Sequence, residues 1–210
     1  MTHILNRRTW AACLIALAAC AHAPLMANGW PAGSTDWDKL ADVKVTQDKK
    51  YLTPQQAFDM KTANPKGVAF FDVRTRTEAV YVGMAQPVVD ALVPFVEHQE
   101  VMSDWDDKRH MYKVEPNQDF VPELERRLKA MGLGKADPII LMCRSGDRSS
   151  KAADRLKMAG YTQVFSVPEG FEGDTAKGGP KDGQRVVNGW KNANLPWTYK
   201  LDKAKMYWPQ

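Results

Sequence analysis

A cysteine and two arginines lie within six consecutive residues of this chain, in a loop that the residue pattern places between a strand and a helix. The segment begins at Cys143 and continues as Arg144, Ser145, Gly146, Asp147, Arg148 and Ser149. The apolar residues 139–142 before it are typical of a buried strand. A loop at the carboxyl end of a parallel strand opens toward ligands, and its amides can converge with the next helix N-terminus on one point. A negatively charged group is stabilised at that point.

This setting favours a nucleophilic role for Cys143. Backbone amides and the side chains of Arg144 and Arg148 stabilise a thiolate relative to a thiol, and the thiolate is the reactive form. The same donors would stabilise a persulfide anion on the cysteine and the oxygens of a sulfur donor such as thiosulfate. Gly146 is expected to form the sharp turn of the cradle. We therefore predict that Cys143 is catalytic and that residues 144–149 bind the substrate.

A second group of charged residues follows another apolar run, residues 68–73. Asp72 and Arg74 stand at the end of this run, and Glu78 comes four residues later. Buried charges at strand ends are normally paired, so we interpret all three as supporting residues. We expect Glu78 to hold the guanidinium of Arg148 in place.

The chain resembles the rhodanese family in these two segments and in a third. The family's active loop has the form Cys-Arg-x-Gly-x-Arg-Ser, which residues 143–149 match. The supporting matches are the Asp-Val-Arg strand end at 72–74 with a nearby acid, and Gly189-Trp190 before Leu195-Pro196. The resemblance covers residues 51–197. It departs from the family pattern at Met84, where histidine is common, and at Asn194, where glycine is usual.

The resemblance implies an α/β fold, with a rhodanese-like open parallel sheet of about five strands and helices on both faces. It also implies a thiosulfate sulfurtransferase, which moves a sulfane sulfur from a donor to a thiophilic acceptor through a persulfide on Cys143. The expected partners are a small sulfur donor and a thiol or cyanide acceptor, or a periplasmic protein as acceptor.

Strand and helix patterns alternate along the chain, in agreement with such a fold. Thr53, followed by Pro54 and Gln56, predicts a capped helix that runs to residue 62. Further helices are expected over 120–131 and from Ser149, as N-cap, to Gly160; strands are expected over 68–73, 91–96 at a sheet edge, 139–142 and 163–167. We interpret residues 97–118 as a polar surface insertion and residues 171–188 as an expanded glycine-rich tract, and both could reshape the mouth of the site.

The N-terminal segment has the layout of a secretory signal peptide. Arg7 and Arg8 precede an uncharged run over residues 10–23, which is shorter than the ~20 residues that span a bilayer. Cleavage after Ala27 would release the protein into the periplasm. A lipobox-like sequence ending at Cys20 leaves a membrane-anchored lipoprotein as the alternative. The expected organisation is a signal peptide (1–27), an N-terminal arm (28–50), a rhodanese-like domain (51–197) and a C-terminal tail (198–210).

Composition argues against several classes of partner. Residues 1–27 hold two of the 29 basic side chains and none of the 25 acidic ones, so the remainder carries a net charge of +2. No basic patch points to nucleic acid. His98 and His110 lack a cysteine or an acid at metal-ligand spacing, so we expect neither a metal nor another cofactor.

Three other functions compete with sulfur transfer. A phosphatase or arsenate reductase of this fold would use a Cys-x5-Arg loop, but here Arg148 gives Cys-x4-Arg and Ser149 occupies the required position. A non-catalytic scaffold and a persulfide carrier that docks a periplasmic protein remain open.

Overall fold

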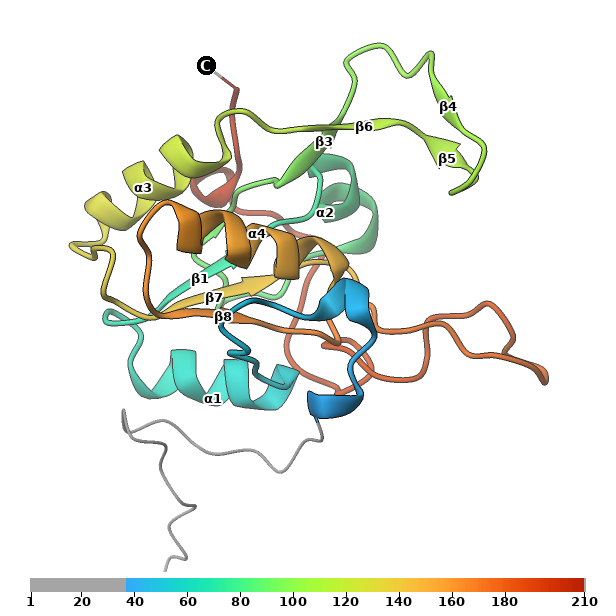
Figure 1. Cartoon of the computed structure of the whole chain (residues 1–210), viewed down its shortest axis with the longest axis horizontal. Coiled ribbons are helices and arrows are strands. Elements are labelled where there is room, and N and C mark those ends of the chain that lie inside the picture. Colours follow the sequence, from blue (N-terminus) through green and yellow to red (C-terminus); the bar gives the residue numbers. More distant parts are fainter. Residues whose placement is uncertain (1–36, 210) are drawn as a thin grey trace, which may run out of the picture. The chain divides into compact units, whose positions relative to one another are not determined.

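The computed structural model describes residues 37–209 (Figure 1). The predicted signal peptide 1–27 and the alternative anchor at Cys20 lie outside these residues, so both stay predictions. Within the described part of the chain, no helix is long and apolar enough to cross a bilayer.

A sheet of four parallel strands, in the order β2-β1-β7-β8, forms the centre of the domain. The strands are β1 (Ala69–Asp72), β2 (Ala91–Leu92), β7 (Ile139–Met142) and β8 (Val164–Ser166). All their residues are buried, as expected for a parallel sheet covered on both faces. A fifth segment extends the sheet beside β8, where Tyr51 forms an isolated parallel bridge with Ser166. The predicted α/β class with an open parallel sheet is confirmed.

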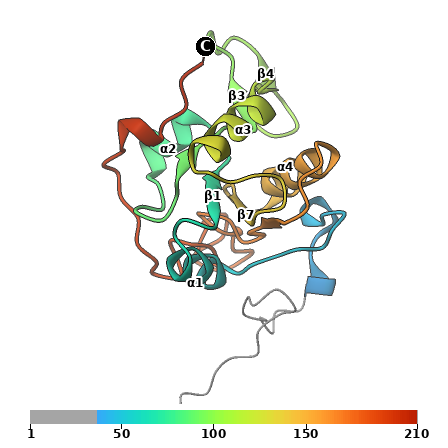
Figure 2. The same cartoon turned by 90° about the vertical axis from the view of Figure 1, so that its left-hand side faces the viewer.

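Helices cover both faces of this sheet (Figure 2). They are α1 (Pro54–Ala63), α2 (Arg76–Val82), α3 (Phe120–Ala130) and α4 (Asp147–Met158). On one face, Phe71 and Leu141 belong to an apolar cluster that includes the buried side chains of α3 and α4. On the other face, Phe70 and Phe58 of α1 pack edge-to-face on Trp190, at centroid distances of 5.7 and 6.1 Å. Neighbouring residues of β1 therefore serve two separate apolar layers.

Two helices start with the same capping arrangement. At α1, the Thr53 side chain accepts the N–H of Gln56 while the Gln56 side chain accepts the N–H of Thr53, as the sequence predicts. At α2, Thr75 and Glu78 form the equivalent box. These boxes satisfy amides that have no partner within the helix.

The predicted N-cap of α4 was wrong. The helix starts at Asp147, two residues before Ser149, and its N-cap is Gly146 in the left-handed region, without a side-chain capping bond. Glycine adopts this conformation without the steric penalty of a Cβ, so the chain can turn into the helix earlier. Ser149 consequently lies buried in the first turn.

The predicted insertion contains short strands that the sequence did not reveal. The strand predicted over 91–96 was too long: the chain leaves the sheet after Leu92, although β2 is an edge strand as predicted. Then β3 (Val96–His98) pairs antiparallel with β6 (Val114–Pro116), and β4 (Trp105–Asp106) pairs with β5 (Met111–Tyr112). Figure 1 shows this segment projecting from the domain beyond α4.

The arm and the tail both pack on the domain. The described part of the arm, residues 37–50, contains two 3-10 turns, Trp37–Lys39 and Asp42–Lys44. Ser150 of α4 donates a hydrogen bond to the carbonyl of Val43 at 2.8 Å. In the tail, the Arg127 guanidinium donates to the carbonyls of Ala204 and Met206, each at 2.7 Å.

Candidate active site

Cys143 follows β7 directly and is the first residue of the loop that leads into α4. Its side chain is only 1% exposed and is a free thiol. The sulfur accepts the backbone N–H of Gly146 at 3.1 Å. Because α4 starts at the next residue, this amide belongs to the positive end of the helix dipole. An anionic sulfur is therefore stabilised by a fixed backbone donor.

Only glycine fits at position 146. Its φ of +99° lies in the left-handed region. A Cβ built on this residue would stand 2.2 Å from the carbonyl oxygen of Pro168, far inside van der Waals contact. The close approach of the segment after β8 thus holds the loop in the conformation that aims the amide at the sulfur.

Two serine hydroxyls lie behind the sulfur. The Cys143 thiol contacts Ser149 Oγ at 3.6 Å, and Ser149 Oγ donates to the carbonyl of Gly146 at 3.1 Å. Ser166 of β8 donates its hydroxyl to Ser149 Oγ at 2.9 Å. Ser166 was missed from the sequence, because no local pattern marks a polar residue of one strand as the neighbour of a distant loop.

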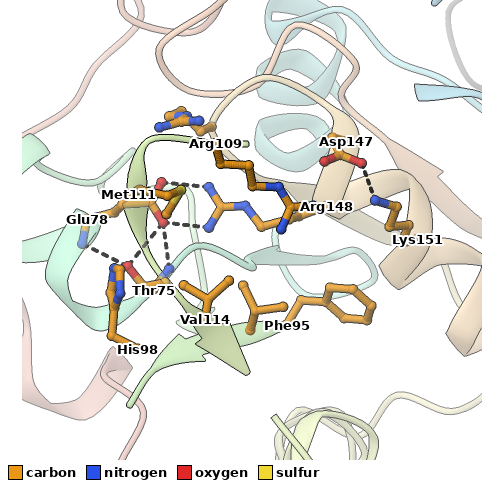
Figure 3. A pocket seen from close by; sticks show the side chains of 12 residues that line it. Thr75, Glu78, Phe95, His98, Arg109, Met111, Val114, Asp147, Arg148 and Lys151 are labelled. Atoms are coloured by element: carbon orange, nitrogen blue, oxygen red, sulfur yellow. Dashed lines mark hydrogen bonds and ion pairs between the residues drawn. The ribbon is translucent and has the colours of Figure 1, made fainter. Parts of the chain in front are cut away.

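Glu78 and Arg148 form a two-point ion pair beside the loop (Figure 3). Nη1 and Nη2 of Arg148 each lie 2.6 Å from one carboxylate oxygen. Burial raises the pKa of Glu78, but the hydrogen bonds and charge of Arg148 outweigh burial and lower this pKa from 4.5 to about 2. Burial lowers the pKa of Arg148, yet the pair with Glu78 and the charge of Cys143 raise it overall. Arg148 is therefore a permanent cation within electrostatic range of the sulfur.

The Thr75 capping box holds the carboxylate of this pair. The backbone N–H of Thr75 donates to Glu78 Oε2 at 2.9 Å. One carboxylate thus caps α2 and clamps the first turn of α4. The sequence contained this signal, because Thr75-x-x-Glu78 is the capping-box pattern.

Asp72 and Arg74 form a separate ion pair that serves the scaffold. Both side chains are fully buried, and Arg74 Nη2 lies 2.6 Å from Asp72 Oδ2. The guanidinium also donates to the carbonyl of Gly83 at 2.7 Å and stacks over the Phe171 ring at 4.0 Å. Neither residue lines the pocket beside the loop. The pair ties the end of β1 to the carbonyl of Gly83 and to the Phe171 ring, and its supporting role stays a prediction.

A pocket of about 240 Å³ opens beside the loop (Figure 3). The loop and the start of α4 line the pocket with Arg144, Asp147, Arg148 and Lys151. The helix α2 and its N-cap line it with Glu78 and Thr75. The segment from Phe95 to the end of β6 supplies the rest: Phe95, Val96, His98, Arg109, Met111 and Val114. These six residues were not predicted as site residues.

Most of the other loop residues do not line the pocket. Four of them lie outside the pocket lining: Cys143, Ser145, Gly146 and Ser149. The sulfur of Cys143 is buried beneath the loop surface. Asp147 pairs with Lys151 at 2.6 Å. Across the described residues, no group of three or more metal-ligating side chains is gathered in one place.

A family model described as "Rhodanese-like domain" matches residues 54–177, more than half of the chain. The chain belongs to the rhodanese-like domain family. An uncharacterized protein of Rickettsia conorii, RC0915, is 28% identical over 144 residues, which cover 69% of this chain and 93% of the relative. The crystal structure of Rv0390 from M. tuberculosis is similar with a TM-score of 0.52 and 29% identity, covering 71% of this chain and 96% of that one.

The two departures from the rhodanese pattern fit the fold. Met84 is fully buried and forms a backbone bridge with Thr198 of the tail. Asn194 has a φ of +55°, in the left-handed region where glycine is usual and asparagine is the best tolerated substitute.

Proposed function

We propose that this protein is a sulfurtransferase in which Cys143 carries the transferred sulfur. The thiolate attacks the outer sulfur of a donor such as thiosulfate, so that a new S–S bond forms to Cys143 and the donor's S–S bond breaks. Sulfite leaves with the electron pair of that bond, and Cys143 is left as a persulfide anion. An acceptor then removes the outer sulfur and restores the thiolate.

One observation carries this proposal: the Cys143 sulfur accepts the Gly146 amide at 3.1 Å, at the start of α4. A cysteine that only filled the core would need no such donor. The Arg148 cation, fixed by Glu78, adds favourable charge for both a thiolate and a persulfide anion. Preorganised donors of this kind stabilise charge without rearrangement during the reaction.

The phosphatase or arsenate reductase alternative finds less support. An arginine that binds a phosphate-like oxyanion uses its terminal nitrogens in a two-point contact. Both terminal nitrogens of Arg148 are already engaged by Glu78. The loop from Cys143 to Arg148 is also one residue shorter than the Cys-x5-Arg spacing.

Whole-protein mass spectrometry after exposure to thiosulfate tests the proposal. We expect a mass gain of one sulfur on Cys143 and none in Cys143→Ser, with unchanged circular dichroism and no turnover in the variant. Steady-state kinetics with thiosulfate and cyanide should give parallel double-reciprocal lines. Absence of the added sulfur would support a scaffold. A loaded cysteine that transfers its sulfur to neither cyanide nor thiols would support a carrier for a partner protein.

We also propose that the protein acts in the periplasm after removal of residues 1–27. The support is the arrangement of Arg7, Arg8 and the uncharged run that follows them. N-terminal sequencing of protein from a periplasmic fraction should begin at Asn28. A diacylated Cys20 recovered from membranes would overturn this in favour of the lipoprotein.

A further inference from the structure

Ser166 is the polar residue of β8, in a part of the fold that is otherwise apolar. Its register partner across the parallel sheet is Leu141 of β7, and α4 packs over both strands (Figure 1). The side chain of Ser166 is fully buried. Among the described residues its hydroxyl has one hydrogen-bond partner, Ser149 Oγ at 2.9 Å. What this hydroxyl does is therefore decided by what it does to Ser149.

The direction of the bond between the two serines follows from counting protons. Each hydroxyl has one proton to donate and two lone pairs to accept with. If Ser149 donated to Ser166, the proton of Ser166 would be buried without an acceptor, which is costly. Ser166 therefore donates and Ser149 Oγ accepts.

The proton of Ser149 is then left with two acceptors. These are the carbonyl of Gly146 at 3.1 Å and the sulfur of Cys143 at 3.6 Å. The carbonyl of Gly146 also accepts the backbone N–H of Ser150 at 3.1 Å, so it keeps a partner when the Ser149 hydroxyl turns toward the sulfur. Hydrogen bonds to an ionised acceptor are the stronger ones, so an anionic sulfur attracts this proton.

This chain of hydrogen bonds distinguishes the two protonation states of Cys143. A thiol must donate its proton to Ser149 Oγ, which already accepts the hydroxyl of Ser166. A thiolate instead accepts from Ser149, whose O–H is a stronger donor because hydrogen bonds in a chain polarise one another. The hydroxyl of Ser166 thus opposes the thiol and favours the thiolate.

We propose that Ser166 is a positioning residue for Cys143, which directs the Ser149 hydroxyl to the sulfur and raises the fraction of thiolate. This inference rests on the proposed role of Cys143 as the nucleophile. Ser166 acts through Ser149, and removal of either hydroxyl changes the same chain of hydrogen bonds.

Charged groups around the loop also act on the sulfur, but independently of Ser166. The elements packed around the loop contribute Arg144, Asp147 and Arg148 from the loop and α4, Glu78 from α2, Asp72 and Arg74 from the end of β1, and Glu169, Glu172 and Arg185 from the segment after β8. Neither serine hydroxyl bonds to any of these side chains. Substitution of Ser166 therefore changes hydrogen bonding and leaves the charges in place.

The ultraviolet absorbance of the thiolate, followed against pH, tests the proposal. Cys143→Ser supplies the reference, because subtraction removes the contributions of the other cysteines and of the tyrosines. We expect Ser166→Ala to raise the midpoint of the Cys143 titration by about 0.5 pH unit, as part of one charge-assisted hydrogen bond would give. Ser149→Ala should raise this midpoint by about one unit or more.

Two further variants separate positioning from a structural role. Because Ser166 acts through Ser149, adding Ser166→Ala to Ser149→Ala should leave the midpoint where Ser149→Ala alone puts it. Phe165→Leu is on the same strand, with its side chain on the opposite face. It should lower stability to urea without moving the midpoint.

The possible failures are distinguishable. The proposal is overturned if Ser166→Ala leaves the midpoint unchanged, or moves it equally with and without the Ser149 hydroxyl. It is also overturned if Phe165→Leu moves the midpoint as far as Ser166→Ala does. Should Ser149→Ala not fold, the comparison of Ser166→Ala with Phe165→Leu decides. The titration needs no sulfur donor, so absence of added sulfur on Cys143 after exposure to thiosulfate contradicts the proposed function instead.

Discussion

Glu78 and Arg148 are 70 residues apart in the chain, yet their carboxylate and guanidinium meet in two parallel hydrogen bonds of 2.6 Å. The pair joins the first turn of α2 to the first turn of α4. Because both oxygens and both terminal nitrogens take part, it determines the orientation of Arg148 as well as its position. The loop that starts at Cys143 is thereby tied to the opposite side of the pocket.

Replacement of Arg148 separates charge from geometry. Lysine keeps the cation but has no planar fork for a two-point contact. Loss of one charge-assisted hydrogen bond costs about 1.5–3 kcal/mol, so Arg148→Lys should lose about 10- to 100-fold in kcat/KM for thiosulfate. Arg148→Ala should be no more than a few-fold worse. A Lys variant with nearly full activity would show that charge alone matters.

The ion pair of Glu78 with Arg148 should make the free energy of unfolding depend on pH in the acidic range. The pKa of Glu78 is lowered from 4.5 to about 2 in the folded protein, so its contribution is fully present above pH 4.5. It is lost as the pH falls toward 2, and amounts to about 3 kcal/mol before discounting for partial exposure. Urea unfolding between pH 6 and 2 should therefore show a difference between the unmodified protein and Glu78→Gln that shrinks with acidification. The surface variant Glu100→Gln controls for net charge and should parallel the unmodified protein.

The serine pair behind the sulfur offers a double-mutant test. Ser149→Ala removes the acceptor of the Ser166 hydroxyl, which is fully buried. Leaving a buried hydroxyl unpaired costs about 1–3 kcal/mol, whereas removing both partners can be nearly neutral. Chemical denaturation should find Ser149→Ala less stable than the Ser149→Ala, Ser166→Ala double variant. If the stability lost by the double variant equals the sum of the losses of the two single variants, the two hydroxyls do not interact.

The close contact at Gly146 predicts a large effect of a single methyl group. Gly146→Ala combines a left-handed backbone with a Cβ placed 2.2 Å from the Pro168 oxygen, and should cost about 3 kcal/mol or more in unfolding free energy. Gly178→Ala has a comparable φ of +74° with nothing within 4 Å of the new Cβ, and should cost about 1 kcal/mol. If both variants lost a similar amount of unfolding free energy, backbone strain alone would explain the effect of Gly146→Ala.

Elements that depend on near neighbours were predictable. The capping box at Thr53 and the buried strand over 139–142 appear where the sequence placed them, because capping and strand burial follow from residues only a few positions apart. The N-cap of α4 was predicted three residues late, at Ser149 instead of Gly146. Serine is a favoured N-cap in general, but the packing of Pro168 against the loop made Gly146 the cap instead.

The strands of the insertion were missed for a different reason. Each has two or three residues, too few to show a period of two. Their stability comes from pairing across the chain, such as His98 with Val114, and from side-chain contacts such as Trp105 on Tyr112 at 5.3 Å. Cross-strand contacts of this kind are not encoded in adjacent residues.

By itself, the sequence determined the α/β class, the strand that delivers Cys143, the glycine turn after it and the family to which the chain belongs. These features depend on short motifs and apolar runs, in which the residues that matter lie close together in the sequence. Only the tertiary structure decided that Ser166 lies behind the sulfur and that Arg109 and Met111 share a pocket with Arg144. Such contacts join segments tens of residues apart, and they form because burial of one surface against another is favourable wherever the chain brings the two together.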